Sequence, residues 1–158
     1  MSVQFPYDVY VLASGRTRET VEQFTHEWLR GFRPTADDYE LPQYATDPIV
    51  MYDSAEGLID VLLKRPDEPH GIYWENTGEG PVATAMLFFT TDGKIIAGLT
   101  VSGDQNTALK YLERLAKTVD ARFGYITGEE PPPDTAAEFV DLARRARPAL
   151  VDAAIQRC

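Results

Sequence analysis

Residues Val82 to Val101 contain two runs rich in β-branched, aromatic and aliphatic residues, separated by Thr-Thr-Asp-Gly. Asp-Gly between two such runs favours a β-hairpin, because glycine adopts a positive φ at no steric cost. A two-residue turn at Asp92-Gly93 puts these side chains on one face: Met86, Phe88, Ile95, Ala97, Leu99 and Val101. A three-residue turn with a glycine bulge instead groups Leu87, Phe89, Ala97 and Leu99. The sequence leaves both registers open. In either register both faces keep large apolar residues, so we predict a central strand pair covered at least partly on both sides.

The length and composition are typical of a globular chain. With 158 residues, of which 44% are hydrophobic and 25% charged, we expect a single α+β domain that spans residues 1–158. No apolar run approaches the length of a membrane span, and the N-terminus lacks the basic start and apolar stretch of a signal peptide. We therefore expect a cytoplasmic protein without membrane contact.

Periodicity predicts the elements of this domain. The expected strands are Tyr7–Ala13, Ile49–Tyr52, Ile72–Glu75, the two hairpin strands and Phe123–Thr127. The expected helices are Thr17–Arg30, a helix from Asp53 to Arg65, Gln105–Ala121, and a last helix from Thr135 that is kinked or interrupted near Pro148. Capping-box patterns start two of them, at Asp53-Ser-Ala-Glu56 and Thr135-Ala-Ala-Glu138. The predicted fold is a largely antiparallel sheet of about six strands with about four helices packed on it.

The search for catalytic groups finds no recognisable motif. Cys158 is the only cysteine, which excludes an internal disulfide framework and any multi-cysteine metal site. No metal-binding histidine spacing or calcium-loop pattern occurs, so we expect no metal and no cofactor. His26 lies on a polar helix face and His70 in a turn, and neither belongs to a nucleophile motif. Adjacent carboxylates such as Asp37-Asp38 arise by chance in an acidic chain. We therefore expect a protein that is not an enzyme.

The formal net charge of −10 narrows the class of partner. It argues against duplex nucleic acid, because phosphate binding uses clustered lysine and arginine. The charge suits attraction to a basic protein, but solubility alone is the favoured explanation, since net charge bears on solubility and association rather than on fold.

The segment from Arg33 to Pro48 has no usable periodicity, and connections of this length often carry function. It interleaves acidic and aromatic residues, namely Asp37, Asp38, Tyr39, Glu40 and Tyr44. Tyrosines beside acids suit an interface with a basic protein, since tyrosine supplies contact area at a low entropy cost. The alternative, which the sequence leaves equally open, is a loop strapped across the core by its tyrosines.

A second acidic segment, Gly128-Glu-Glu-Pro-Pro-Pro133, cannot pair in a central ladder because proline lacks the amide donor. Glu129 and Glu130 beside the rigid prolines are the second candidate contact. The simpler explanation is that the prolines carry the chain across a sheet edge to the last helix.

From Ile49 to about Asp134, the chain resembles the small cytoplasmic immunity proteins of bacterial polymorphic toxins delivered by contact-dependent or type VI systems. The resemblance is one of overall pattern: an acidic α+β domain, the LFFTTDGKIIAGLTV hairpin, a helix from Gln105 and the FGYITGEEPPP segment. It implies a protein that binds a cognate toxin and blocks the toxin's active site. Without a signal peptide, that toxin is expected to act in the cytosol, as nucleases, deaminases and nucleotide-modifying toxins do.

The alternative function is a small-molecule-binding or regulatory domain that uses a cleft between sheet and helices, either as a single chain or as a homodimer. Apolar residues on both hairpin faces suit this alternative, because ligand pockets are mostly apolar with a few polar groups. A deep pocket would favour the ligand, and an exposed acidic and aromatic patch would favour the inhibitor.

Overall fold

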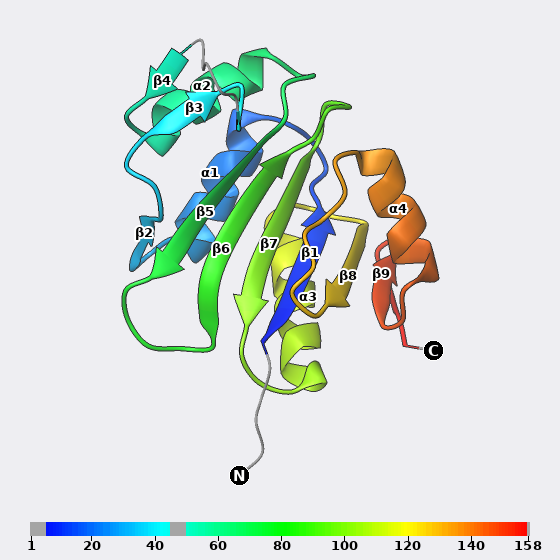
Figure 1. Ribbon diagram of the computed structural model, residues 1–158. Coiled ribbons are helices and arrows are strands. Elements are labelled where there is room, and N and C mark those ends of the chain that lie inside the picture. Colours follow the sequence, from blue (N-terminus) through cyan, green and yellow to red (C-terminus); the bar gives the residue numbers. More distant parts are fainter. Residues whose placement is uncertain (1–5, 45–49, 158) are drawn as a thin grey trace.

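The structure is a computed structural model that describes residues 6–44 and 50–157. These residues form an α+β fold with one large antiparallel sheet, a small second sheet and four helices (Figure 1). The large sheet has the strand order β10 (Ala154–Gln156), β9 (Ala149–Val151), β8 (Phe123–Thr127), β1 (Tyr7–Leu12), β7 (Ile95–Val101), β6 (Val82–Phe89), β5 (His70–Asn76) and β2 (Phe32–Pro34). The small sheet pairs β3 (Tyr39–Leu41) with β4 (Val50–Tyr52). The helices are α1 (Arg18–Trp28), α2 (Ala55–Lys64), α3 (Gln105–Thr118) and α4 (Ala136–Arg145). The predicted fold class is confirmed.

The central hairpin adopts the second of the two registers left open above. Phe89 pairs with Ile95, and the Thr90 amide donates to the Lys94 carbonyl at 3.0 Å, which leaves three residues in the turn. Gly93 has a φ of 85°, which only glycine adopts at no steric cost. The hairpin lies between β1 and β5, so its predicted central place in the sheet is confirmed.

Side-chain caps start the helices. Thr135 caps α4 and accepts a hydrogen bond from the Glu138 amide at 3.1 Å, as the capping-box pattern predicts. The predicted N-cap residue of α2 was wrong by one position. Ser54, and not Asp53, accepts a hydrogen bond from the Gly57 amide. Asp92, in the turn of the hairpin, adds a second cap to α4, since its carboxylate accepts from the Ala136 amide at 2.9 Å.

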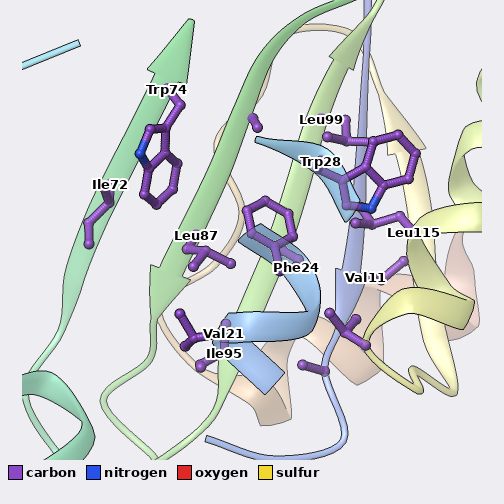
Figure 2. Close-up of a cluster of buried hydrophobic side chains, with 14 of the residues drawn as sticks. Val11, Val21, Phe24, Trp28, Ile72, Trp74, Leu87, Ile95, Leu99 and Leu115 are labelled. Atoms are coloured by element: carbon purple, nitrogen blue, oxygen red, sulfur yellow. The ribbon is translucent and has the colours of Figure 1, made fainter. Parts of the chain in front are cut away.

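One face of the large sheet, which we call the closed face, is covered by α1, α2 and α3. Phe24 of α1, Leu58 of α2 and Leu112 of α3 have no exposed surface. Figure 2 shows Phe24 and Trp28 of α1 in one cluster with Leu87 and other side chains of the central strands. Trp28 is only 6% exposed, so the prediction that it is a core residue is confirmed.

Four short strands were not predicted. β2 and β3 lie in the segment from Arg33 to Pro48, which was expected to lack regular structure, and residues 45–49 lie outside the described residues. β9 and β10 follow the last helix, which ends at Arg145 before Pro148 and does not continue as a kinked helix. Each of these strands has three residues. Such short segments have no periodicity of their own and form only where a partner strand is already in place.

Candidate functional site

The second face of the large sheet carries a row of aromatic rings that four of its strands contribute. Tyr73 of β5 and Phe88 of β6 meet edge to face with ring centroids 5.6 Å apart. Phe88 meets Tyr10 of β1 at 6.1 Å, and Tyr10 meets Tyr125 of β8 at 5.9 Å. Tyr125 in turn packs on Phe139 of α4 at 4.9 Å. These distances are typical of favourable aromatic pairs, so the row is a continuous packed unit.

Two glycines make room for this row. Tyr10 reaches Phe88 across β7 because Gly98 lies beneath it, and a Cβ atom there would be 2.7 Å from the Tyr10 ring. At Gly71 of β5, a Cβ atom would lie 3.2 Å from the Phe88 ring. The absence of these side chains lets the rings lie over the strands.

The row is covered at one end only. α4 packs on β8, β9 and β1, and there Phe139 and Tyr10 are buried (Figure 1). Toward β5 and β6 no helix among the described residues covers this face. Met86 is buried there, but four other outward side chains are only half-buried. We call this part of the sheet the open half-face; its half-buried side chains are Tyr73, Glu75, Thr84 and Phe88.

Two chain segments border the open half-face. Tyr44 and Gln43 on one side, and the prolines Pro131 to Pro133 on the other, line a hollow of about 180 Å³ whose floor includes Tyr73 and Phe88. The proline segment crosses in front of β1 (Figure 1), where the Tyr10 hydroxyl donates to the Glu130 carbonyl at 2.9 Å. The expectation of a crossing at a sheet edge was therefore wrong, because the segment runs over the sheet face.

The border that Gln43 and Tyr44 form is fixed to the edge of β5. The Gln43 side-chain amide donates to the Gly71 carbonyl at 3.3 Å, and its oxygen accepts from the Gly71 amide at 2.8 Å. Gln43 thus pairs with β5 much as a neighbouring strand would. His70 holds the same segment, with Nε2 2.9 Å from the Glu40 carbonyl oxygen. His70 is 5% exposed and belongs to β5, so its prediction as a polar turn residue was wrong.

Beyond Gln43, the hollow continues into a second one of about 310 Å³ that shares Gln43, His70, Gly71 and Tyr73 with the first. Asp38 and Met51 lie on its rim. Met51 is 54% and Tyr44 81% exposed. Large apolar side chains with this much exposure, set among acids, are typical of a surface that contacts another molecule.

The structure distinguishes the predicted loop residues from one another. Asp37 and Asp38 are exposed, whereas Tyr39 is 6% exposed and its buried hydroxyl has no hydrogen-bond partner among the described residues. The Glu40 carboxylate accepts from the Tyr44 amide at 2.9 Å and so shapes the loop. The alternative interpretation therefore holds for Tyr39, which straps the segment to the core, whereas Tyr44 points to solvent and its role in an interface stays a prediction.

The second predicted pair, Glu129 and Glu130, is exposed and leads directly into the prolines that border the open half-face. The fold therefore brings the two acidic segments to opposite sides of one surface, although Glu129 follows Tyr44 by 85 positions in the sequence. Glu129 has a φ of 60°, in the left-handed region that residues other than glycine rarely adopt.

Sequence reasoning missed Asp8, a carboxylate in the middle of the strand YDVYVL. Asp8 is 8% exposed and accepts from the Thr100 hydroxyl at 2.8 Å and from the Tyr10 hydroxyl at 3.4 Å. Burial raises the pKa of Asp8, these two hydrogen bonds lower it, and the charge of Glu129 raises it further; the pKa lies above its ordinary value. No described lysine or arginine forms an ion pair with Asp8. An acid within an apolar strand was the signal that could have identified it.

The described part of the chain gives little support to metal binding or to membrane crossing. No group of three or more histidine, cysteine, aspartate and glutamate side chains there is placed to hold a metal ion. None of the described helices combines the length and the apolar character that crossing a membrane requires. Burial and the charge of Glu130 raise the pKa of Tyr125 to about 12, so this hydroxyl stays protonated at neutral pH.

Comparisons with known proteins give limited information. No protein-family model matches the chain, and no curated protein matches it. Among solved structures, a chain in the crystal structure of the toxic C-terminal tip of CdiA from Pseudomonas aeruginosa in complex with immune protein is similar, with 17% identity and a TM-score of 0.41. The match covers 80% of this chain and 88% of that chain. A score and an identity this low carry no argument about function.

Proposed function

We propose that this chain is an immunity protein that binds a cognate, cytosol-acting bacterial toxin and neutralises it by blocking its active site. The observation that carries the proposal is the surface at the β3 end of the molecule, where Tyr44 and Met51 are strongly exposed beside Asp37 and Asp38. Tyrosine and methionine are enriched in protein interfaces, and acids at a rim select a basic partner. The resemblance of Ile49 to Asp134 to immunity proteins supports the same function.

The proposed contact residues are Asp37, Asp38, Glu40 and Tyr44, followed by Glu129 and Glu130. Tyr39 supports this surface from beneath, since its ring is in the core. The acids give fast, salt-sensitive association with a basic toxin, such as a nuclease or nucleotide-modifying domain. The protein itself is proposed to be non-catalytic and to act in the cytoplasm.

A second candidate function is the binding of a small molecule. The hollow of about 310 Å³ favours it, because apolar and polar groups converge there around the buried His70. Its size lies at the lower end of the range for ligand pockets, roughly 300–1,000 Å³. The exposed Tyr44 is better explained by a protein partner, because Tyr44 does not line this hollow and a ligand inside it would leave the ring in water.

The test is growth of a heterologous bacterium that expresses the protein encoded beside this gene, with and without this chain. The proposal predicts that the neighbour stops growth and that this chain restores it. The double variant Asp37→Lys and Asp38→Lys should weaken the rescue, because both carboxylates are exposed and their reversal leaves the fold intact. Glu113→Lys, an exposed position on α3, is the control. A neighbour that is harmless, or that kills regardless of this chain, would contradict the proposal.

A further inference from the structure

The hollow of about 310 Å³ beside β3, which we call the acidic hollow, can be reached from outside the chain. Asp38 and Met51 line it, and both are exposed. Because it shares Gln43 and Tyr73 with the hollow of about 180 Å³, the two form one groove along the open half-face, from the small sheet to the proline segment. Exposed apolar side chains around such a groove favour an occupant from outside the chain.

The aspartates and glutamates that line this groove identify the charge of that occupant. Asp38 and Glu40 line the acidic hollow and Asp134 lines the smaller hollow, and no described lysine or arginine lines either. Within the described part of the chain, neither Asp38 nor Glu40 forms an ion pair. The groove therefore complements a cationic occupant.

Hollows elsewhere on the molecule have a different lining. The hollow of about 340 Å³ that α3, β9 and β10 line includes Lys117. The hollow of about 410 Å³ near the end of β1 includes Lys94 and Arg122, and the hollow of about 400 Å³ beside α1 includes Arg18. A lining with carboxylates and without lysine or arginine is therefore a property of this groove, and not a general result of the net charge of −10.

The apolar lining of the acidic hollow narrows the chemistry of the occupant further. Met51 and Tyr73 line it together with the two acids. Lysine and arginine combine an apolar stem with a charged end, so one such side chain can bury its stem against Met51 and Tyr73 while its charge meets the carboxylates. Glu40 is already oriented, because its Oε1 accepts from the Tyr44 amide at 2.9 Å. An oriented carboxylate lowers the ordering cost of binding.

We infer that the toxin docks across the open half-face and inserts one lysine or arginine side chain into the acidic hollow, where its charge contacts Asp38 and Glu40. The inference rests on the proposed function and names the toxin group that this surface selects. Tyr44, which is 81% exposed and lines the smaller hollow, packs against the toxin beside this side chain.

The experiment measures the affinity of the purified toxin domain encoded beside this gene for variants of the full chain, by isothermal titration calorimetry at low and high salt. Ala36 is exposed and lines the acidic hollow, so Ala36→Trp should fill the hollow without a change of charge. We expect it to raise Kd at least about tenfold, because the bulky ring takes the place of the toxin side chain. The control Ala154→Trp, at an exposed position on β10, should leave Kd within about twofold.

A matched pair of charge variants tests the contact itself. Asp38→Asn should raise Kd by about fivefold to tenfold and flatten its salt dependence. Asp37→Asn removes the neighbouring exposed acid, which does not line the hollow, and should raise Kd by less than about twofold. In a double-mutant cycle, the lysines and arginines of the toxin are replaced one at a time by glutamine. One of them should lose most of its effect on affinity when the chain carries Asp38→Asn.

The results that would overturn the inference differ from those that would overturn the proposed function. Wild-type binding with Ala36→Trp and Asp38→Asn both within about twofold of it would overturn the inference alone. Equal losses for Asp37→Asn and Asp38→Asn, with no effect of Ala36→Trp, would do the same, since they would show attraction to the whole loop. Dimerisation of the unbound chain that Ala36→Trp abolishes would assign the groove to a second copy and overturn the inference. Absence of wild-type binding would overturn the proposed function, and the inference with it.

Discussion

The two faces of the large sheet are built by the same alternation of side chains, yet they differ in what covers them. On the closed face, three helices bury Phe24, Leu58 and Leu112 completely. On the second face, one helix covers the β8 and β9 end, and Tyr73 and Phe88 at the other end stay half-buried. The comparison teaches that the two faces differ in how completely the chain covers them. The closed face supplies most of the apolar burial, and the open half-face leaves aromatic and acidic side chains partly accessible.

The largest expected difference between the two faces is in the cost of removing an aromatic ring. Phe24→Ala on the closed face should lower the free energy of unfolding by about 3–5 kcal/mol, since Phe24 has no exposed surface and its loss leaves a cavity. Tyr73→Ala on the open half-face should cost about 1 kcal/mol, mainly its edge-to-face contact with Phe88. Urea unfolding measures both values. Equal losses would show that the second face is as essential to stability as the first.

A medium effect is expected at Gly98, where the second face depends on a missing side chain. Gly98→Ala places a Cβ atom 2.7 Å from the Tyr10 ring, so the aromatic row must shift. We expect a loss of about 1–3 kcal/mol in the free energy of unfolding, as for other overpacked sites. The near-ultraviolet circular dichroism of the tyrosines should change with it. An unchanged spectrum and midpoint would mean that Tyr10 moves freely and the row is not a packed unit.

The smallest expected stability effects concern two aspartates with opposite pKa shifts. Burial alone would raise the pKa of Asp92, but hydrogen bonds from Ala136, Thr90 and Ala137 outweigh it and hold the pKa below its ordinary value of 3.8. The stability that Asp92 contributes is present above 3.8 and is lost as the pH falls through the lowered pKa. Asp92→Asn should therefore cost roughly 1 kcal/mol at neutral pH and nothing in strong acid.

Asp8 should behave in the opposite way, since burial raises its pKa above 3.8. Its contribution to stability is complete below 3.8 and declines as the pH rises through the raised pKa. Asp8→Asn should therefore be more stable than the wild type at neutral pH, and the difference should vanish in acid. Thermal unfolding of both variants across the acidic range checks the two signs. A loss of stability on Asp8→Asn at neutral pH would contradict the account of Asp8 as an uncompensated acid.

Much of the fold could be predicted because local patterns carry it. The hairpin at Val82–Val101 and the helix from Gln105 have strong periodicity, and the structure contains both. β2 and β9 could not be predicted, since three residues show no period and their pairing depends on distant partners. Arg16 illustrates the same limit: its guanidinium donates to the carbonyls of Leu62 and Thr90, contacts that nothing near residue 16 in the sequence indicates.

The candidate site was predictable only in part. The composition of the sequence identified the two acidic segments. It did not show that they border the same surface, which they do because the proline segment crosses over β1. Tyr39 and Tyr44 looked equivalent in the sequence, and tertiary packing buries one and exposes the other. Asp8 was missed although the sequence YDVYVL shows an acid within an apolar strand, because the sequence does not show that its carboxylate is buried.

The most direct test of the open half-face as the docking surface is hydrogen–deuterium exchange of the chain, alone and with the toxin domain encoded beside its gene. The account predicts slower exchange in residues 35–44 and 128–134 on binding, while the exposed turns of α1 and α3 are unchanged. Slower exchange confined to α1 and α3, with both border segments unaffected, would place the toxin on the helix-covered side and contradict the account.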